Sequence, residues 1–311
     1  MPKEEKQEEP KTPTLIGLYS RYYKQLLIIP FVILLISMGI IGASYLRTGE
    51  FFNKDVSLKG GATVTVIKEG MDINELQSAL SQEFDDVNVR LLSETGKQKG
   101  AIIDAGIAEN EVGGLLAGIE QKTGVPRSEY TVQFIGSALG ASFFSEAMMA
   151  VLIAFALMGL TVFAYFRFLA GVKTAVIIPS LFTIWAAFND IICTFAVLVL
   201  FDVKLSTAGL AAFLMLIGYS IDTDILLTTR VLKGKEGSIL SRTLGAAKTG
   251  ITLSLTSFVA VFAGYIFSQS ITIKQIMLVL WIGLLFDILH TWITNAGMLR
   301  WYLERKKTQN E

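Results

Sequence analysis

The chain has 311 residues, of which 52% are apolar and 17% charged, with no net charge. Soluble domains carry nearer a quarter charged residues, so this composition excludes a disordered scaffold and argues against an ordinary cytosolic enzyme. The single cysteine, Cys193, excludes an intrachain disulfide and a cysteine-based zinc site, and the single histidine, His290, argues against His-rich metal chemistry and a Ser-His protease. Without a basic excess, nothing points to nucleic acid. We therefore expect no metal, no cofactor and no nucleic-acid partner.

Six apolar stretches are long enough to cross a bilayer, which takes about 20 helical residues. In chain order they cover residues 26–46, 148–166, 174–200, 205–227, 249–267 and 276–298. The first follows a polar tail and is longer than the apolar core of a signal peptide, so we interpret it as a membrane helix. The pattern predicts a polytopic α-helical membrane protein with one span, an inserted domain and five further spans.

Basic residues gather on one side of these spans, in both tails and in the loops after the second and fourth spans. They are Lys3, Lys6, Lys11, Arg21, Lys24, Arg167, Lys173, Arg230, Lys233, Lys235, Arg242, Lys248, Arg300, Arg305, Lys306 and Lys307. The short loops on the other side hold only Lys204 and Lys274. Because basic loops stay in the cytoplasm, both termini are predicted to be cytoplasmic. The predicted segments are a cytoplasmic tail (1–25), transmembrane helix 1 (26–46), an extracytoplasmic domain (47–147), a five-helix transmembrane core (148–298) and a cytoplasmic tail (299–311).

The inserted domain, in which acids outnumber bases, shows a readable order of elements. Strand-like runs cover 62–67, 87–92, 101–105 and 130–135, and helix-like runs cover 108–123 and the stretch from a predicted cap at Asp72 to about Glu83. The order β-α-β-β-α-β predicts a ferredoxin-like α+β domain. That fold hosts many functions, so it does not identify one.

Four acids fall inside the predicted spans: Asp190, Asp222, Asp224 and Asp287. Burying an ionised carboxylate near the bilayer centre costs roughly 2.5–3.5 kcal/mol, so each needs a partner, a water-filled cavity or a proton, and each is a functional candidate. Structural hydrogen bonding between helices is the alternative for Asp190. Residues two apart on a helix point about 200° apart, so Asp222 and Asp224 cannot share one face, which argues against a metal site there.

Three neighbours of these acids are further candidates. Gly218 lies one turn before Asp222 and would let another helix approach closely. Arg230 either pairs with a carboxylate, if the helix end distorts, or extends to the headgroups. His290 follows Asp287 by three residues, so the two can meet on one face, as a proton relay or as a packed histidine.

Several segments match the motifs of one membrane-protein family. Gly60-Gly61 before a β-rich run resembles that family's Asp-Phe-x-Gly-Gly motif, with Ser57-Leu58-Lys59 in place of its first residues. Gly218-Tyr219-Ser220-Ile221 matches the fourth-span signature, and the segments 165–168, 189–190 and 240–244 are similar to their family counterparts. Together with the one-plus-five layout, these segments resemble the SecD/SecF family of protein-export membrane proteins, in particular its smaller, archaeal-type SecF branch.

The resemblance implies a role in protein export driven by the proton or sodium gradient, within the resistance-nodulation-division (RND) superfamily and without enzymatic activity. The implied partners are SecD, a SecY-type channel, an unfolded exported polypeptide and the lipid bilayer. The implied ion-coupling candidates are Asp222, Asp224, Asp190, Asp287 and Arg230, with Gly218 and Ser220 as packing residues beside them. Bacterial relatives have Asn-Asp-Thr where this chain has Asp222-Thr223-Asp224. Asp222 aligns with an acid of the sister subunit, which favours Asp222 over Asp224.

Two other classes of protein remain open at this point. A stand-alone RND-like transporter of small molecules or lipids predicts a ligand cavity and activity without a partner subunit. An intramembrane aspartyl protease needs two carboxylates that meet across a water, for example Asp222 and Asp287. The chain lacks the Gly-x-Gly-Asp signature of those proteases.

Overall fold

The computed structural model describes residues 15–84, 86–94, 97–169, 177–234 and 237–310. Residues 1–14 of the predicted N-terminal tail, with Lys3, Lys6 and Lys11, and the loop residues Lys173 and Lys235 lie outside this described part.

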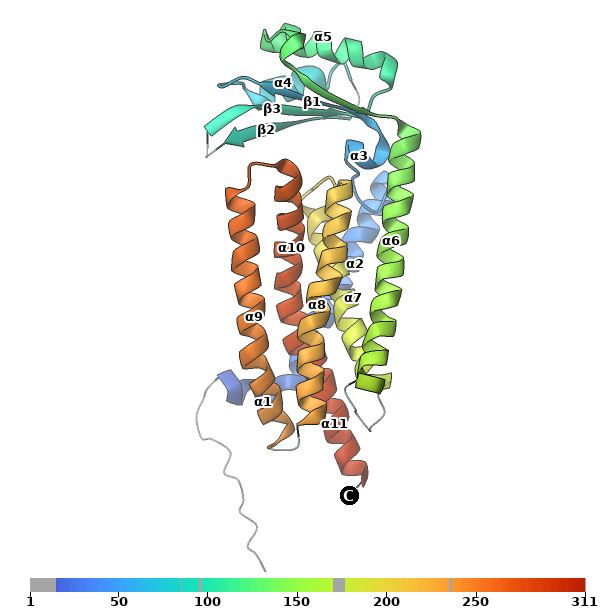
Figure 1. Ribbon diagram of the computed structural model, residues 1–311, viewed down its shortest axis with the longest axis vertical. Helices are drawn as coiled ribbons and strands as arrows, with labels where there is room; N and C mark the ends of the chain where they lie inside the picture. The colour runs from blue at the N-terminus through green and yellow to red at the C-terminus, as the bar shows by residue number, and fades with distance from the viewer. Residues whose placement is uncertain (1–14, 85, 95–96, 170–176, 235–236, 311) are drawn as a thin grey trace, which may run out of the picture.

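Six helices in the described residues are long and apolar enough to span a membrane, which confirms the prediction of a polytopic helical protein (Figure 1). They are α2 (Ile28–Thr48), α6 (Ser137–Ala164, extended by a π-helical turn, Tyr165–Leu169), α7 (Ile177–Leu200), α8 (Thr207–Lys233), α9 (Ile239–Phe267) and a sixth unit. The sixth unit consists of α10 (Ile271–Leu289), a π-helical segment η4 (His290–Asn295) and α11 (Ala296–Asn310).

Three of these helices form the centre of the bundle. Half of the most hydrophobic window is buried in α7 and in α8 (50% each) and 44% in the α10 unit, against 11% in α6 and α9. The peripheral helices leave large apolar side chains exposed, such as Leu152, Leu157 and Leu160 of α6. Apolar side chains exposed at this depth face lipid, whereas polar groups on the buried faces of α7, α8 and α10 lie in a protein interior.

The inserted domain is an antiparallel sheet with two helices on one face. Strands β1 (Gly61–Ile67), β2 (Val87–Glu94), β3 (Lys97–Ala105) and β4 (Thr131–Ile135) are hydrogen-bonded in the order β2-β3-β1-β4. Helices α4 (Ile73–Leu80) and α5 (Val112–Thr123) cover the face away from the bundle (Figure 1). All four predicted strands and both helices are present, and Asp72 accepts hydrogen bonds from the first-turn N–H groups of α4 as predicted.

Alternation along β1 gives the sheet two different faces. Val64 and Val66 are fully buried beneath the helices, against Leu80, Leu115 and other core residues. Thr63 and Thr65 point to the opposite face, where they line a cavity shared with α8 and α10. Because side chains alternate along a strand, one face carries the domain core and the other presents polar groups to the bundle.

A short joint attaches the sheet to the bundle. Helix α3 (Val56–Lys59) is capped by Asp55, and backbone hydrogen bonds join Asn53 and Asp55 to Leu205 at the outer end of the bundle (2.9 and 2.8 Å). Gly60 follows α3 at φ +91°, and a Cβ there would lie 2.5 Å from the Cα of Ser137 on α6. Helix α6 starts before the apolar stretch at 148, so it continues from the membrane up to the sheet.

An additional helix lies across the opposite end of the bundle. Helix α1 (Leu15–Leu26) crosses the bundle near the lower ends of α8 and α9 in Figure 1, and its Tyr23 is buried against Glu304 and Arg300 of α11. Leu18 is 60% exposed on the same helix, which also carries Arg21 and Lys24. Such an amphipathic helix is typical of the membrane interface.

Candidate functional site

A cluster of buried polar side chains lies between α7, α8 and the α10 unit. Asp190 of α7 has no exposed surface and accepts a hydrogen bond from Ser220 Oγ of α8 at 2.6 Å. Its other oxygen, Oδ1, lies 2.6 Å from Nδ1 of His290, which is equally buried. Asp190 therefore links α7 to both α8 and η4.

Asp287 of α10 is bound by two hydroxyl groups. Thr223 Oγ1 of α8 lies 3.1 and 3.3 Å from its two oxygens, and Thr291 Oγ1 lies 3.2 Å from Oδ1. Asp287 has no exposed surface. A hydroxyl can donate to a carboxylate or accept from a carboxylic acid, so these contacts are compatible with either charge state.

Asp224 of α8 is the third buried acid. Asn295 Nδ2 donates to its Oδ1 at 2.8 Å, while Oδ2 has no hydrogen-bond partner within the described residues. Both His290 and Asn295 belong to the π-helical segment η4. A π-helical segment changes the angular position of the residues that follow, and such segments occur often at functional sites. Here it provides contacts to two acids on two different helices.

The charge balance of this cluster distinguishes it from a structural ion pair. Three carboxyl groups face one imidazole, and no Lys or Arg bonds to them among the described residues. Buried polar atoms are normally hydrogen-bonded, yet Asp224 Oδ2, His290 Nε2 and Asn295 Oδ1 have no protein partner there. Ionised acids are costly at this depth, so three carboxyl groups beside a single imidazole make the cluster a candidate for proton exchange.

The remaining predicted residues lie elsewhere. Asp222 is exposed on the outward face of α8. Gly218 and Tyr219 lie beside it: a Cβ added at Gly218 would meet no atom within 4 Å, and Tyr219 is 40% exposed. Arg230 is exposed and donates to Gly245 O (2.9 Å) and Thr249 Oγ1 (3.1 Å) of α9. In the described part of the chain it therefore contacts α9 and not a carboxylate.

The structure thus groups Asp190, Asp224 and Asp287 with Ser220, and separates them from Asp222. The functional preference for Asp222 over Asp224 stays a prediction, but burial favours Asp224. The protease alternative paired Asp222 with Asp287, and these two residues differ completely in environment, one exposed and one buried.

Three members of the cluster were not predicted: Thr223, Thr291 and Asn295. A signal for two of them exists, because Asp287, Thr291 and Asn295 recur every four residues through an apolar span. The spacing of three residues allows His290 to meet Asp287 on one face, but its hydrogen bond goes to Asp190 on another helix.

The glycine motif lies at the joint between the sheet and the bundle. Gly61 begins β1 at φ +129°, and a Cβ there would lie 2.2 Å from Ala105 O. At Gly140 of α6 a Cβ would lie 2.5 Å from Gly60 N. Gly61 lets β1 pack closely against β3, and Gly60 and Gly140 let the end of α3 pack backbone against backbone on α6, which fixes the sheet relative to the second span.

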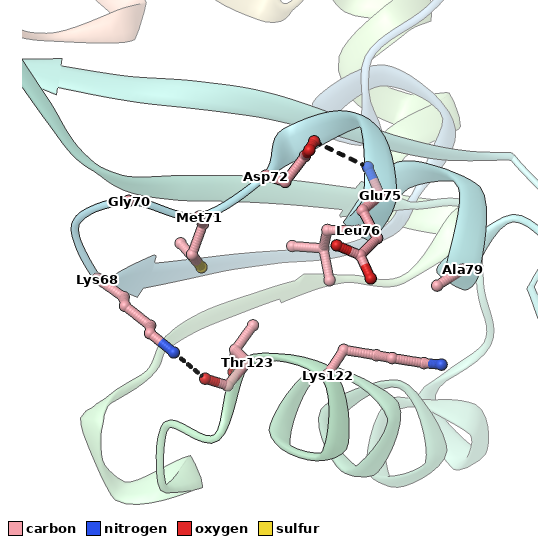
Figure 2. Close-up of a pocket in the computed structure, with 9 residues that line it drawn as sticks. All are labelled: Lys68, Gly70, Met71, Asp72, Glu75, Leu76, Ala79, Lys122 and Thr123. Carbon is pink, nitrogen blue, oxygen red and sulfur yellow. Dashed lines mark hydrogen bonds between the residues drawn. The ribbon is translucent and has the colours of Figure 1, made fainter.

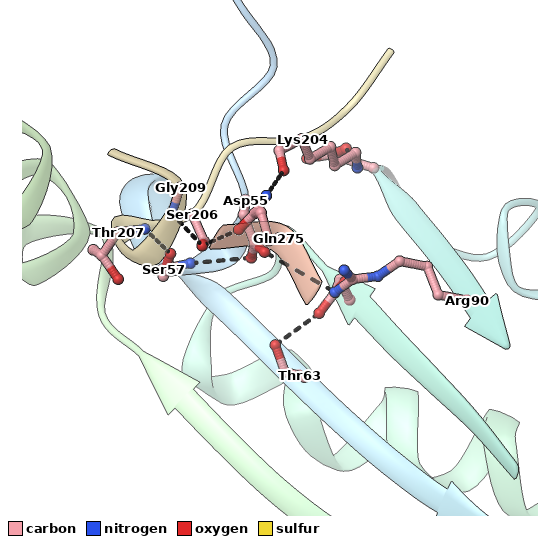
Figure 3. A network of polar contacts seen from close by, with 11 residues as sticks. Asp55, Ser57, Thr63, Arg90, Lys204, Ser206, Thr207, Gly209 and Gln275 are labelled. Carbon is pink, nitrogen blue, oxygen red and sulfur yellow. Dashed lines mark hydrogen bonds and ion pairs between the residues drawn. The ribbon is translucent and has the colours of Figure 1, made fainter. Parts of the chain in front are cut away.

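A second polar network occupies the side of the sheet that faces the bundle (Figure 3). Arg90 of β2 pairs with Asp104 of β3 and lies 4.0 Å from Asp55, and Thr63 donates to Asp104 at 2.8 Å. At the bundle end, Gln275 Nε2 donates to Lys204 O at 2.6 Å, and Gln275 also bonds to Ser206. The cavity between these groups has a volume of about 320 Å³.

A smaller cavity of about 190 Å³ lies between the start of α4 and the end of α5 (Figure 2). Lys68 donates to Thr123 O at its edge, at 2.5 Å, and Asp72, Glu75 and Lys122 complete the charged lining. Within the described residues no group of three or more His, Cys, Asp and Glu side chains is arranged to hold a metal ion.

Fold and site together define a class: a polytopic helical membrane protein with a one-plus-five arrangement, an inserted antiparallel α+β domain and a buried carboxylate cluster between its central spans. The family model for the C-terminal part of the protein-export membrane proteins SecD and SecF matches residues 117–305. The chain belongs to this SecD/SecF family, whose members are membrane proteins of export and not enzymes.

Two SecF proteins with similar sequences agree with this assignment. The chain is 34% identical over 286 residues to the protein-export membrane protein SecF of Pyrococcus furiosus, covering 91% of this chain and 92% of that protein. It is 36% identical over 300 residues to SecF of Methanothermobacter thermautotrophicus, covering 94% and 97%. Both relatives are archaeal, as the sequence predicted.

Solved structures show the same fold in a longer protein. The crystal structure of SecDF from Thermus thermophilus, a translocon-associated membrane protein, matches with a TM-score of 0.71 at 16% identity. The match covers 96% of this chain and 39% of that one, so this chain spans about two fifths of the SecDF protein. A SecDF structure in a super-membrane-facing form matches with a TM-score of 0.59 at 18% identity.

Proposed function

We propose that this chain is the SecF subunit of an archaeal-type SecD–SecF complex that uses the proton or sodium gradient to promote export of unfolded polypeptides. The observation that carries the proposal is the buried cluster of Asp190, Asp224, Asp287 and His290. Family membership supports export, and the cluster supplies the group through which a gradient can act.

The proposed mechanism rests on a change of charge within the cluster. Moving one elementary charge through 100 mV yields about 2.3 kcal/mol. Each buried acid bonds to a partner on another helix: Asp190 to α8 and η4, Asp287 to α8, and Asp224 to η4. Gaining or losing a proton changes the strength of these contacts, so α7, α8 and α10 shift relative to one another. Helix α8 would transmit the shift to the sheet, because Leu205 before it and Thr207 at its start bond to the joint.

We place the protein in the cytoplasmic membrane with both termini in the cytoplasm and the sheet domain outside. The α1 and α11 helices lie at the end opposite the sheet, and Arg242, Arg300 and Arg305 lie at that end as well. We assign the inserted domain to the ferredoxin-like fold, on the strand order β2-β3-β1-β4 and the element order β-α-β-β-α-β. The segment boundaries at 25, 46, 147 and 298 remain proposals, with α6 beginning at Ser137.

We assign the outward face of α8 to contact with SecD. Asp222, Gly218 and Tyr219 are exposed there at membrane depth, and an exposed carboxylate facing lipid is unfavourable. A glycine with open space beside it allows a second helix to approach closely. A SecY-type channel and the exported polypeptide would meet the assembled complex. We place this complex in the RND superfamily, as the family resemblance implies.

Two neighbouring acids provide a matched test. We would introduce Asp224→Asn and Asp222→Asn separately into the chromosomal gene, and follow export of a secreted reporter with and without a collapsed gradient. Asp224→Asn is expected to remove the gradient-dependent part of export with SecD still co-purifying. Asp222→Asn is expected to keep the ion response and to weaken co-purification of SecD. Gradient-dependent export that survives Asp224→Asn would contradict the proposed coupling site.

A further inference from the structure

A cavity of about 690 Å³ opens at the end of the bundle away from the sheet, and the export mechanism makes no use of it. It lies between the end of α8, the start of α9, helix α1 and helix α11. Its charged lining consists of four bases and one acid, namely Arg242, Arg300, Lys306, Lys307 and Glu304. This excess of positive charge suits an anion.

The guanidinium of Arg300 is held in place but incompletely paired. Arg300 is 8% exposed, its Nε donates to Glu304 Oε1 at 2.7 Å, and its planar group lies 4.1 Å from the ring centre of Tyr23. Its Nη1 is buried without a partner within the described residues. A buried guanidinium N–H calls for an acceptor, so Arg300 is fixed in position to bind one more oxygen.

The N-terminus of α9 contributes backbone donors to the same cavity. Ser238 caps this 29-residue helix by accepting from Ser241 N at 3.1 Å, while Ile239 and Leu240 of the first turn line the cavity. The first N–H groups of a helix have no partner within it, and the helix dipole favours negative charge there. Arg242 is anchored by a bond to Val231 O at 2.8 Å, and its Nε is also without a partner in the described part.

The position of the cavity indicates which anions it meets. Helix α8 ends beside it at Lys233, and amphipathic α1, whose Ser20 lines the cavity, marks the membrane interface. Apolar side chains, among them Leu232 and Leu303, share the lining with the bases. Basic pockets between membrane helices at headgroup depth are suited to anionic lipid headgroups.

We infer that this cavity binds the phosphate of an anionic phospholipid from the leaflet at this end of the bundle. The phosphate oxygens would accept from Arg300 and the N-terminus of α9, with Lys306 at the rim, while the acyl chains follow the apolar surface of the bundle. This lipid would join α1, α9 and α11. The inference does not depend on the proposed ion-coupling role.

Native mass spectrometry of the full-length protein, titrated with phosphatidylglycerol or phosphatidylcholine, tests the site. We expect a saturable phosphatidylglycerol adduct that phosphatidylcholine does not displace. Arg300→Gln should weaken it about tenfold, the range expected for one hydrogen bond to a charged group. Lys306→Gln, at a less buried position, should weaken it by about two- to threefold, as for an exposed charge pair.

Arg305→Gln is the matched control, because it removes the same charge from the same helix at an exposed position outside the cavity lining. Equal loss of the adduct in Arg305→Gln and Lys306→Gln would overturn the site in favour of nonspecific attraction. Displacement of the lipid by inorganic phosphate at comparable concentration would overturn the lipid and identify a free-anion site. The Lys306→Gln comparison remains informative if Arg300→Gln fails to fold.

Discussion

Two polar clusters in this protein contain similar residues in different surroundings. Beneath the sheet, Asp55 and Asp104 share Arg90. Within the bundle, His290 bonds to Asp190, in a cluster that also contains Asp224 and Asp287. The base beneath the sheet is Arg90, whose charge is permanent. The base in the bundle is His290, and histidine is the side chain whose charge ordinarily changes near neutral pH. The base, and not the acids, therefore distinguishes the network beneath the sheet from the cluster that we propose to exchange protons.

Surroundings strengthen this difference. In the cluster beneath the sheet, burial and the neighbouring carboxylate of Asp104 raise the pKa of Asp55, while the Arg90 guanidinium opposes the rise. Arg90 is 34% exposed, so water shares in its solvation. The bundle cluster has no such access, since Asp190, Asp224 and Asp287 have no exposed surface. Because water does not reach the bundle cluster, a change of charge there requires the contacts between helices to rearrange.

The largest effect is expected from His290→Leu. The change leaves Asp190 buried with Ser220 as its remaining side-chain partner. Removing one partner of a buried ion pair lowers the free energy of unfolding by about 3–5 kcal/mol, which thermal unfolding in detergent would detect. Adding Asp190→Leu should restore much of that stability without restoring gradient-dependent export. A His290→Leu protein as stable as the wild type would show that the pair is not ionic.

Gly60→Ala comes next and tests the joint between the two regions. The new Cβ would lie 2.5 Å from the Cα of Ser137, at φ +91°. Backbone strain of this kind costs about 1–3 kcal/mol, and the clash adds to it. We expect faster proteolysis between the sheet and α6. Gly136→Ala is the control, because its Cβ position has no atom within 4 Å. Equal resistance in both variants would contradict the close packing.

Arg90→Met removes the permanent charge beneath the sheet. It leaves Asp104, 3% exposed, with Thr63 as its remaining side-chain partner. We expect the free energy of unfolding to fall by about 1 kcal/mol, the lower end for an unsatisfied buried group, because the arginine is partly exposed. The gradient dependence of export should be unchanged. Its loss would show that the network beneath the sheet also takes part in coupling, contrary to the proposed difference between the two clusters. Arg127→Met, from the exposed pair with Glu120, should have a smaller effect.

The smallest effect concerns pH. Because the pKa of Asp55 is raised above its ordinary value of 3.8, the folded state binds this proton more tightly than the unfolded state. Its contribution to stability therefore increases as pH falls through the folded pKa toward 3.8 and is lost as pH rises. Asp55→Asn should remove this slope and still cap α3. Unfolding midpoints measured from neutral to acidic pH would check it, and an unchanged slope would assign the titration to another group.

Local patterns in the sequence anticipated much of the fold. The strand at Gly61–Ile67 and the cap at Asp72 follow from alternation and from a short acidic side chain before an apolar run. Helix α1 was not anticipated, because its apolar residues are too few to resemble a span. Arg242 and Arg300 indicate only membrane orientation in the sequence, because nothing local shows that they border one cavity.

The number of spans, the order of elements in the inserted domain and the exclusion of a disulfide follow from the sequence, because apolar length, side-chain period and composition are local properties. Helical geometry likewise predicts that Asp222 and Asp224 face different ways. Which of the two is buried depends on how α8 is rotated in the bundle, so it follows from the tertiary structure and not from the sequence. The contact of His290 with Asp190 likewise depends on the π-helical turn and on α7, a helix 100 residues away in the sequence.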